Sequence, residues 1–510
     1  MAPGRALEEL FEKAPGAYEV VIFNAEPRVN YDRIMLSPVL SGEKTFDEIV
    51  IHGDGWYIEH GVTLYKGHKI ISIDRDAKTV TSDQGVTQPY DKLLIATGSS
   101  PVIIPVPGHD LPGVLTYRDL DDVTAMLLAA KSGGDAVVIG GGLLGLEAAA
   151  GLKEQGMNVT VLHLMPTLME RQLDAPAGHL LQAALEARGI DILTGANTKE
   201  ILPTRDGKGV SAVRLDDGSE IKADLVVMAV GIRPSAQLAK DAGIEINRGI
   251  LVDPHMRTSD PDIYAVGECV EFDGKVYGLV APLYQMASVA ANELANASDI
   301  EFKDSALATK LKVTGVDLYS AGDFAEGEDR EEIVLRDAAK GVYKRLVIKD
   351  QRIIGVVLYG DTADGGWFFQ HIKDGADISE MRDTLIFGPA FAGGDALDPM
   401  AAVAALPDDA EICGCNGVCK GKIVETINNK NLTALDDVRA HTKASSSCGT
   451  CTGLVEQLMS LTLGDAYNPN AVAAMCGCTD LSHGDVRRLI KAKSLKTIPN
   501  LNQALEWKSS

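Results

Sequence analysis

Cysteines of this chain gather near its C-terminal end. Seven of the eight lie between Cys413 and Cys478, including a C-x-C pair (Cys413, Cys415) and a C-x-x-C pair (Cys448, Cys451). In a chain without a signal peptide this clustering indicates metal or iron–sulfur ligation rather than a disulfide framework. Four thiolates suit either a 2Fe–2S cluster or a structural zinc ion, and the spacing alone leaves both open.

A second motif with chemical meaning is glycine-rich. The apolar run Ala136–Ile139 predicts a buried strand, GGGLLG follows at 140–145, and a helix is expected through about residue 155 before a strand over 159–162. In this strand–turn–helix–strand context, Gly140 permits a tight turn, Gly142 lets a pyrophosphate approach the backbone, and Gly145 lets the helix pack against the strand. The unit therefore predicts dinucleotide binding.

The second strand of this unit ends on an unexpected residue. An acidic side chain is usual there for the adenosine ribose, but this chain has His163, with Glu170 and Arg171 shortly after it. His163 either contacts the cofactor or is an ordinary strand-end histidine. Both NADH and NADPH stay open, with a preference for NADH.

Part of another nucleotide fold precedes this unit. Residues 1–13 predict a helix, residues 18–23 a strand, and Glu26 follows where an acidic residue would bind a ribose, unless it is a solvated loop carboxylate. The first strand and glycine turn of such a fold are absent. That strand is central in a doubly wound sheet, so we expect the natural protein to begin upstream of Met1.

Three further apolar strands end in small-residue turns, at 91–99, 223–231 and 260–270, and a helix is expected over 282–295. They predict an outer nucleotide domain with a second one inserted. Cys269 has no neighbouring cysteine in this half, so we predict a structural role for it rather than a redox-active disulfide.

Four short motifs carry a family resemblance: ATGS at 96–99, GGGLLG at 140–145, AVGIRP at 229–234 and IYAVGE at 263–268. They resemble the two-dinucleotide flavoprotein reductases, which pass a hydride from a nicotinamide to a flavin. No catalytic side chain stands out. The resemblance implies FAD contacts at Glu26, Ala96, Thr97, Gly98, Gly267 and Glu268, and NAD(P)H contacts at Gly140, Gly142, Gly145, His163 and Gly231.

The C-terminal part predicts smaller domains. Residues 305–375 contain short β-rich runs typical of a closing domain. Trp367 and the two phenylalanines after it either cover the flavin or pack in the core, and core packing is the preferred prediction. Residues 388–409 predict a linker. The following cysteine pairs, each followed by a helical pattern, resemble bacterioferritin-associated ferredoxin domains. This resemblance implies a 2Fe–2S cluster on Cys413, Cys415, Cys448 and Cys451, with Cys419 as a spare.

An internal repeat extends the cysteine region. A shift of 63 residues places Cys413 and Cys415 on Cys476 and Cys478, and the register holds to Ser510. We expect a second module that stops where its C-x-x-C pair should begin.

The whole chain resembles the large subunit of assimilatory NAD(P)H-dependent nitrite reductases, especially at 25–44, 163–174 and 476–490. The expected class is α/β, with two doubly wound dinucleotide-binding domains, a small α+β closing domain and small α-helical Cys-rich modules. The predicted boundaries are 1–115 with 235–300 for FAD, 116–234 for NAD(P), 301–387 for the closing domain, 388–409 for the linker, 410–465 for the 2Fe–2S module and 472–510 for the second module.

The resemblance implies the electron-input part of a nitrite reductase, working with a sirohaem module or a small nitrite reductase subunit. The sirohaem and 4Fe–4S half of the family is missing here. Two alternatives stay open: an electron-transfer subunit of assimilatory nitrate reductase, and a zinc-stabilised assembly or sensor module. The net charge of −24 argues against nucleic-acid and membrane partners. We expect a cytoplasmic protein, with a homodimer possible.

Overall fold

The computed structural model describes residues 1–304, 308–311, 315–389, 391, 399–414, 416–447, 449, 451–468 and 489. The chain divides into two compact units, Met1–Ile386 and Phe387–Ser510. The second Cys-rich module predicted at 472–510 lies outside the described residues, apart from the single position 489.

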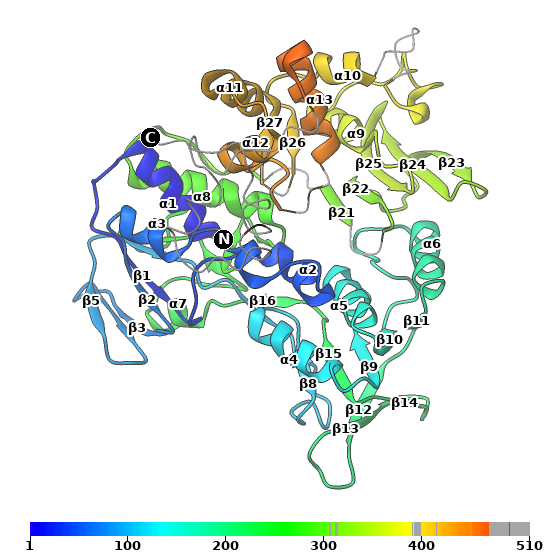
Figure 1. The fold of residues 1–510 in the computed structure, drawn as a ribbon, viewed down its shortest axis with the longest axis horizontal. Helices are drawn as coiled ribbons and strands as arrows, with labels where there is room; N and C mark the ends of the chain where they lie inside the picture. The colour runs from blue at the N-terminus through cyan, green and yellow to red at the C-terminus, as the bar shows by residue number, and fades with distance from the viewer. Residues whose placement is uncertain are drawn as a thin grey trace. The chain divides into compact units, whose positions relative to one another are not determined.

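A five-stranded parallel sheet forms the inserted nucleotide domain of the first unit (Figure 1). Its strand order is β11-β10-β9-β15-β8, so the chain crosses over between neighbouring strands as in a doubly wound fold. Its elements are β8 (Val114–Thr116), α4 (Leu120–Ala130), β9 (Asp135–Ile139), α5 (Leu143–Glu154), β10 (Asn158–His163), α6 (Ala175–Glu186), β11 (Ile190–Thr194) and β15 (Leu225–Met228).

The outer nucleotide domain has its parallel strands in two separate pairs, β1 with β2 and β6 with β18. In the described part of the chain no strand joins the pairs, and the residues before β1 form α1 instead, which packs along α8 (Figure 1). These elements are α1 (Ala2–Lys13), β1 (Val21–Asn24), β2 (Thr63–Lys66), β6 (Leu93–Ile95), β18 (Ile263–Ala265) and α8 (Val280–Leu294).

Strands β1, β6 and β18 are shorter than the apolar runs that predict them. The register of β1 runs from Val21↔Thr63 to Asn24↔Lys66, and β6 pairs with β18 over three residues. Each strand therefore extends only as far as its pairing with the neighbouring strand, and the remaining residues of each predicted run lie outside it.

Smaller elements complete these two domains. The short strands are β3 (Ile70–Asp74), β4 (Thr79–Ser82), β5 (Thr87–Pro89), β7 (Ser99–Pro101), β12 (Thr198–Pro203), β13 (Val210–Leu215), β14 (Glu220–Lys222), β16 (Ile232–Pro234), β17 (Ile250–Leu251), β19 (Val270–Phe272) and β20 (Lys275–Val276). The short helices are η1 (Arg33–Met35), α2 (Leu36–Ser41), η2 (Phe46–Ile49), α3 (Asp54–Glu59) and α7 (Gln237–Asp241).

An antiparallel sheet of order β21-β22-β25-β24-β23 follows, with α9 packed on it. Phe368 and Phe369 of α9 are buried in the core of this sheet and Trp367 packs against the same core, so the structure favours core packing for this aromatic group. The elements are β21 (Ala308–Leu311), β22 (Leu318–Gly322), β23 (Glu331–Asp337), β24 (Val342–Lys349), β25 (Arg352–Tyr359), α9 (Gly365–Asp374) and η3 (Leu385–Phe387).

The second unit is mainly helical. Its described elements are α10 (Pro399–Ala405), β26 (Glu411–Cys413), β27 (Val418–Cys419), α11 (Lys420–Lys430), α12 (Leu435–Thr442), α13 (Thr452–Leu463) and η4 (Gly464–Ala466). Within the predicted linker 388–409, residues 399–405 form α10, and Val403 of this helix is buried in the core of the unit. Among the described residues, no helix is both long and apolar enough to span a bilayer.

Candidate functional site

The glycine-rich turn between β9 and α5 has the conformation that its sequence predicts. Gly140 has φ +122°, and a Cβ there would overlap the Ala229 carbonyl oxygen, while a Cβ on Gly145 would overlap the Gly140 carbonyl oxygen. Gly142 differs, because it caps α5 and a Cβ there would have no atom within 4 Å. The turn therefore leaves open space at the helix N-terminus, where N–H groups can receive a pyrophosphate.

Gly231 lies in the segment after β15, the neighbour of β9 in the sheet. It has φ +114°, and a Cβ there would also have no atom within 4 Å. Since parallel neighbours end at the same edge, this second open glycine lies on the edge that carries the glycine-rich turn.

His163 at the end of β10 turns inward. Its ring is buried, Nδ1 accepts the N–H of Gly141 at 3.0 Å, and Nε2 lies 3.0 Å from both the Thr167 carbonyl oxygen and Glu170 Oε2. Both ring nitrogens thus have protein partners. A direct cofactor contact through either nitrogen, one of the two roles open from the sequence, is not favoured by this geometry.

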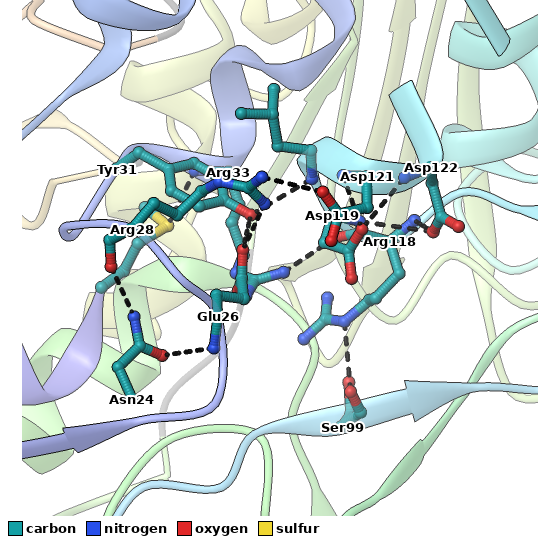
Figure 2. Close-up of polar contacts among 12 residues, drawn as sticks. Asn24, Glu26, Arg28, Tyr31, Arg33, Ser99, Arg118, Asp119, Asp121 and Asp122 are labelled. Atoms are coloured by element: carbon teal, nitrogen blue, oxygen red, sulfur yellow. Dashed lines mark hydrogen bonds and ion pairs between the residues drawn. The ribbon is translucent and has the colours of Figure 1, made fainter. Parts of the chain in front are cut away.

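Glu26 lies after β1 in a cluster of polar side chains (Figure 2). It forms an ion pair with Arg33, accepts a hydrogen bond from Tyr31 at 2.8 Å, and lies 3.6 Å from Arg28. Burial raises the pKa of Tyr31 well above its usual value, so this hydroxyl stays a donor to the carboxylate. Glu26 is therefore not a freely solvated loop carboxylate.

The motifs after β6 and β18 meet at one edge because these strands are parallel neighbours. Ser99 donates to Glu268 at 2.8 Å, and Arg118 pairs with Glu268 while also donating to the Ser99 carbonyl oxygen at 3.2 Å (the latter contact is drawn in Figure 2). Gly98 and Gly267 both have positive φ, which lets the backbone turn sharply at these strand ends.

Ala96 and Thr97 belong to the same turn. The Thr97 hydroxyl donates to the Ser235 carbonyl oxygen at 2.7 Å, and Ala96 packs against the core of this domain.

The two arginines of this region, Arg33 and Arg118, were not predicted as site residues. Arg33 falls inside the family-like stretch 25–44, whereas no local signal marks Arg118.

This residue set fits FAD. Two carboxylates can bind hydroxyl groups, and two arginines can bind a pyrophosphate. Cys269 lies beneath this edge, buried and hydrogen-bonded at 3.3 Å to the Val266 carbonyl oxygen, and its burial raises the pKa of its thiol.

A carboxyl group that sequence reasoning missed lies on α5. Glu147 is half-buried, Ser37 donates to it at 2.6 Å, and Ser37 is also 2.9 Å from the hydroxyl of buried Tyr117. Burial raises the pKa of Glu147 to about 7, against a smaller opposite effect of the Ser37 hydrogen bond. The group can therefore hold or release a proton near neutral pH.

In the second unit, Cys413 and Cys451 are buried, and Cys451 caps the N-terminus of α13. A helix N-terminus favours the negative charge of a thiolate. Cys415 and Cys448 lie outside the described residues, and within the described ones no group of three or more metal-ligating side chains is found. Cys419, the predicted spare, caps α11.

Asn416 joins the two cysteine-bearing loops. Its buried amide donates to the Lys443 carbonyl oxygen at 2.9 Å and to Ser447 at 3.1 Å, and lies 3.8 Å from Cys413 Sγ. The side chain thus brings the C-x-C loop next to the residue that precedes the C-x-x-C pair. Buried thiolate donors held this way suit a 2Fe–2S cluster.

Comparison with known families decides the assignment. Residues 5–295 match the model of the pyridine nucleotide-disulphide oxidoreductases. The chain belongs to this family. The oxidoreductase also matches the rubredoxin NAD⁺ reductase C-terminal domain over 308–376 and the BFD-like [2Fe-2S] binding domain over 411–460. Its cofactors are accordingly FAD, NAD(P)H and a 2Fe–2S cluster, which resolves the choice between iron–sulfur and zinc.

Individual relatives extend the similarity over the whole chain. The oxidoreductase is 46% identical over 510 residues to a nitrite reductase [NAD(P)H] of Bacillus subtilis (strain 168), covering 100% of this chain and 62% of that protein. It is 40% identical over 514 residues to an assimilatory nitrate reductase electron transfer subunit of the same strain, covering 100% and 65%. The chain thus spans less than two thirds of the length of either relative.

A solved structure with this fold is NADH:rubredoxin oxidoreductase from Clostridium acetobutylicum. It is 28% identical, with a TM-score of 0.63, and the match covers 75% of this chain and 96% of that one. The fold class expected from the sequence, a two-dinucleotide reductase followed by a Cys-rich module, is confirmed.

Proposed function

We propose that this chain is the electron-input part of an assimilatory nitrite reductase. The proposal rests on one chain that combines a dinucleotide reductase at 5–295 with a 2Fe–2S domain at 411–460. It is supported by 46% identity to a nitrite reductase [NAD(P)H] over the full length of this chain. The partner would be a sirohaem-containing module or a small nitrite reductase subunit.

The cofactors supply the redox chemistry: the flavin takes two electrons as a hydride from the nicotinamide, and the cluster carries electrons singly. The protein positions them. The open face at Gly142 and the N-terminus of α5 would receive the dinucleotide pyrophosphate. Glu26 and Glu268, each held by an arginine, would orient FAD, and Cys413 and Cys451 would hold the cluster with Cys415 and Cys448.

An anaerobic titration of the purified chain tests this proposal. NADH or NADPH should bleach the flavin absorbance and then produce the electron paramagnetic resonance signal of a reduced 2Fe–2S cluster. The reduced chain should reduce artificial acceptors, and nitrite only after a sirohaem-containing nitrite-reducing protein is added. Conversion of nitrite to ammonia by the chain alone would contradict the proposed division of labour.

A second candidate rests on the full-length match to an assimilatory nitrate reductase electron transfer subunit. In that case the reduced chain would pass electrons to a separate nitrate reductase. Adding purified nitrate reductase and nitrite reductase modules in turn, and following reoxidation of the cluster, separates the two candidates. The cytoplasmic location, the domain boundaries and a homodimer remain predictions.

A further inference from the structure

The strand that should end on a ribose-binding acid ends on His163 instead, and the structure shows what this histidine does. Its Nδ1 accepts the Gly141 N–H at 3.0 Å. A backbone N–H can only donate, so Nδ1 carries no hydrogen and the hydrogen of the neutral ring lies on Nε2. Nε2–H is therefore a donor.

This donor faces a carboxylate and a backbone carbonyl oxygen. Nε2 lies 3.0 Å from Glu170 Oε2 and 3.0 Å from the Thr167 carbonyl oxygen. The side chain of Glu170 is 30% exposed, whereas that of His163 is 9% exposed. The imidazole is thus covered, while the carboxylate beyond it reaches the surface at the same strand end.

The loop that carries Glu170 is fastened to the glycine-rich turn. Met169 donates its N–H to the Gly141 carbonyl oxygen at 3.0 Å and adopts a left-handed φ of +52°. Leu168 and Met169 are both buried. These contacts fix the backbone beside Glu170, so its carboxylate is held close to the turn that receives the pyrophosphate.

We propose that Glu170, oriented by His163, binds the adenosine ribose hydroxyls and so makes the site selective for NADH over NADPH. The carboxylate that is usually on the strand is supplied here by the loop after it. A carboxylate accepts hydrogen bonds from a ribose diol and repels a 2′-phosphate. The inference rests on the dinucleotide-binding function of this domain and does not depend on the electron acceptor.

Binding of two cofactor fragments to the purified full chain tests this proposal. Calorimetry with ADP-ribose and with 2′-phospho-ADP-ribose requires no reduction of flavin or cluster. The unaltered chain should bind ADP-ribose at least about tenfold more tightly, and Glu170→Gln should weaken ADP-ribose binding about ten- to hundredfold, as expected for a charged hydrogen bond. The same substitution should strengthen binding of the 2′-phosphate.

Arg171 supplies the matched control because it is the exposed cation next to Glu170. Arg171→Gln should leave the preference unchanged. If Arg171→Gln abolishes 2′-phospho-ADP-ribose binding while Glu170→Gln changes neither ligand, the proposal is overturned and the site is selective for NADPH. If neither fragment binds the unaltered chain, the dinucleotide function itself fails.

The positioning role of His163 is tested separately. His163→Asn retains an acceptor for the Gly141 N–H but is too short to reach Glu170, whereas His163→Gln retains a donor near the Nε2 position. We expect His163→Asn to raise the KM for NADH with kcat unchanged. His163→Gln should retain much of the preference for NADH over NADPH. Equal loss in both variants, with a matching fall in the melting temperature, would show a purely structural histidine.

Discussion

Gly145 lies directly against the carbonyl oxygen of Gly140, so that a Cβ on Gly145 would overlap this oxygen. Gly142, two residues after Gly140 in the same turn, faces open space instead. One glycine thus serves the packing of α5 against β9, and the other serves access to the turn. The difference can be measured.

Gly145→Ala should destabilise the inserted domain by about 1–3 kcal/mol, the usual cost of overpacking a close contact. Gly142→Ala should cost less than about 1 kcal/mol, because its backbone conformation suits alanine. Gly142→Ala should instead weaken ADP-ribose binding at least about tenfold. Urea unfolding and calorimetry check the pair, and equal stability losses in both variants would contradict this division of roles.

Glu147 should make stability depend on pH. Burial raises its pKa from 4.5 to about 7, so the folded chain binds the proton more tightly than the unfolded chain. The resulting stabilisation is complete below pH 4.5 and is lost as the pH rises towards 7, by about 3 kcal/mol in total. Glu147→Gln has no such proton, so its stability relative to the unaltered chain should increase over this range.

Melting temperatures of both chains, measured between pH 4.5 and 8 at equal flavin content, check this prediction. Ser37→Ala is a useful companion, because removing the hydrogen bond from the carboxylate should raise the pKa of Glu147 further and move the pH dependence upward. Parallel pH profiles for the unaltered chain and Glu147→Gln would contradict the assignment.

Asp174 links the inserted domain to the closing sheet. It accepts the Ala177 N–H at 3.1 Å as the N-cap of α6, and it binds the Tyr343 hydroxyl at 2.6 Å and buried Arg345 at 3.3 Å. Asp174→Ala should lower the free energy of unfolding by about 2–4 kcal/mol, since it removes a cap and one partner of a buried cation. Asp174→Asn retains the cap and should cost less.

Asp329 provides the control for this experiment, because it pairs with Lys349 at the surface and is exposed. Asp329→Asn should change the free energy of unfolding by less than about 1 kcal/mol. Chemical unfolding followed by circular dichroism measures all three variants. A similar loss for the surface and buried aspartates would contradict the proposed link.

The cluster ligands can be tested one at a time. Replacement of Cys413, Cys415, Cys448 or Cys451 by serine should abolish the 2Fe–2S resonance signal and lower the iron content, because serine is a poor substitute for a thiolate ligand. Cys419→Ser should leave both unchanged. If Cys419→Ser loses iron, Cys419 is a cluster ligand in place of one of the four predicted cysteines. If the unaltered chain contains zinc and no iron, the assignment of a 2Fe–2S cluster is wrong.

Local patterns in the sequence were sufficient for several of the elements. The strand, glycine turn and helix at 135–154 occur as predicted, as do the helices at 2–13 and 280–294. These features depend on apolar periodicity and on glycine conformations, which are properties of neighbouring residues. The contacts predicted for individual glycines and cysteines with their cofactors stay predictions.

Side-chain partners depended on the tertiary structure. Three contacts of the site join positions that no local pattern relates, at separations from 22 to 150 residues. They are the ion pair of Arg118 with Glu268, the hydrogen bond from Ser37 to Glu147, and the hydrogen bond from the Gly141 N–H to His163. Likewise, residues 388–409 show no clear periodicity, yet they contain α10. Val403 of this helix packs in the core of its unit, a contact that the local sequence does not predict.

The sequence by itself thus determined that the chain can bind dinucleotides and a thiolate-held metal or cluster, since glycine turns and cysteine pairs act through the backbone and donor atoms of a few consecutive residues. Only the tertiary structure decided which charged groups are paired, which carboxyl group is half-buried, and which carboxylate reaches the surface beside the glycine-rich turn. Burial and pairing depend on which distant segments the fold brings into contact, and these set the energies of charged groups.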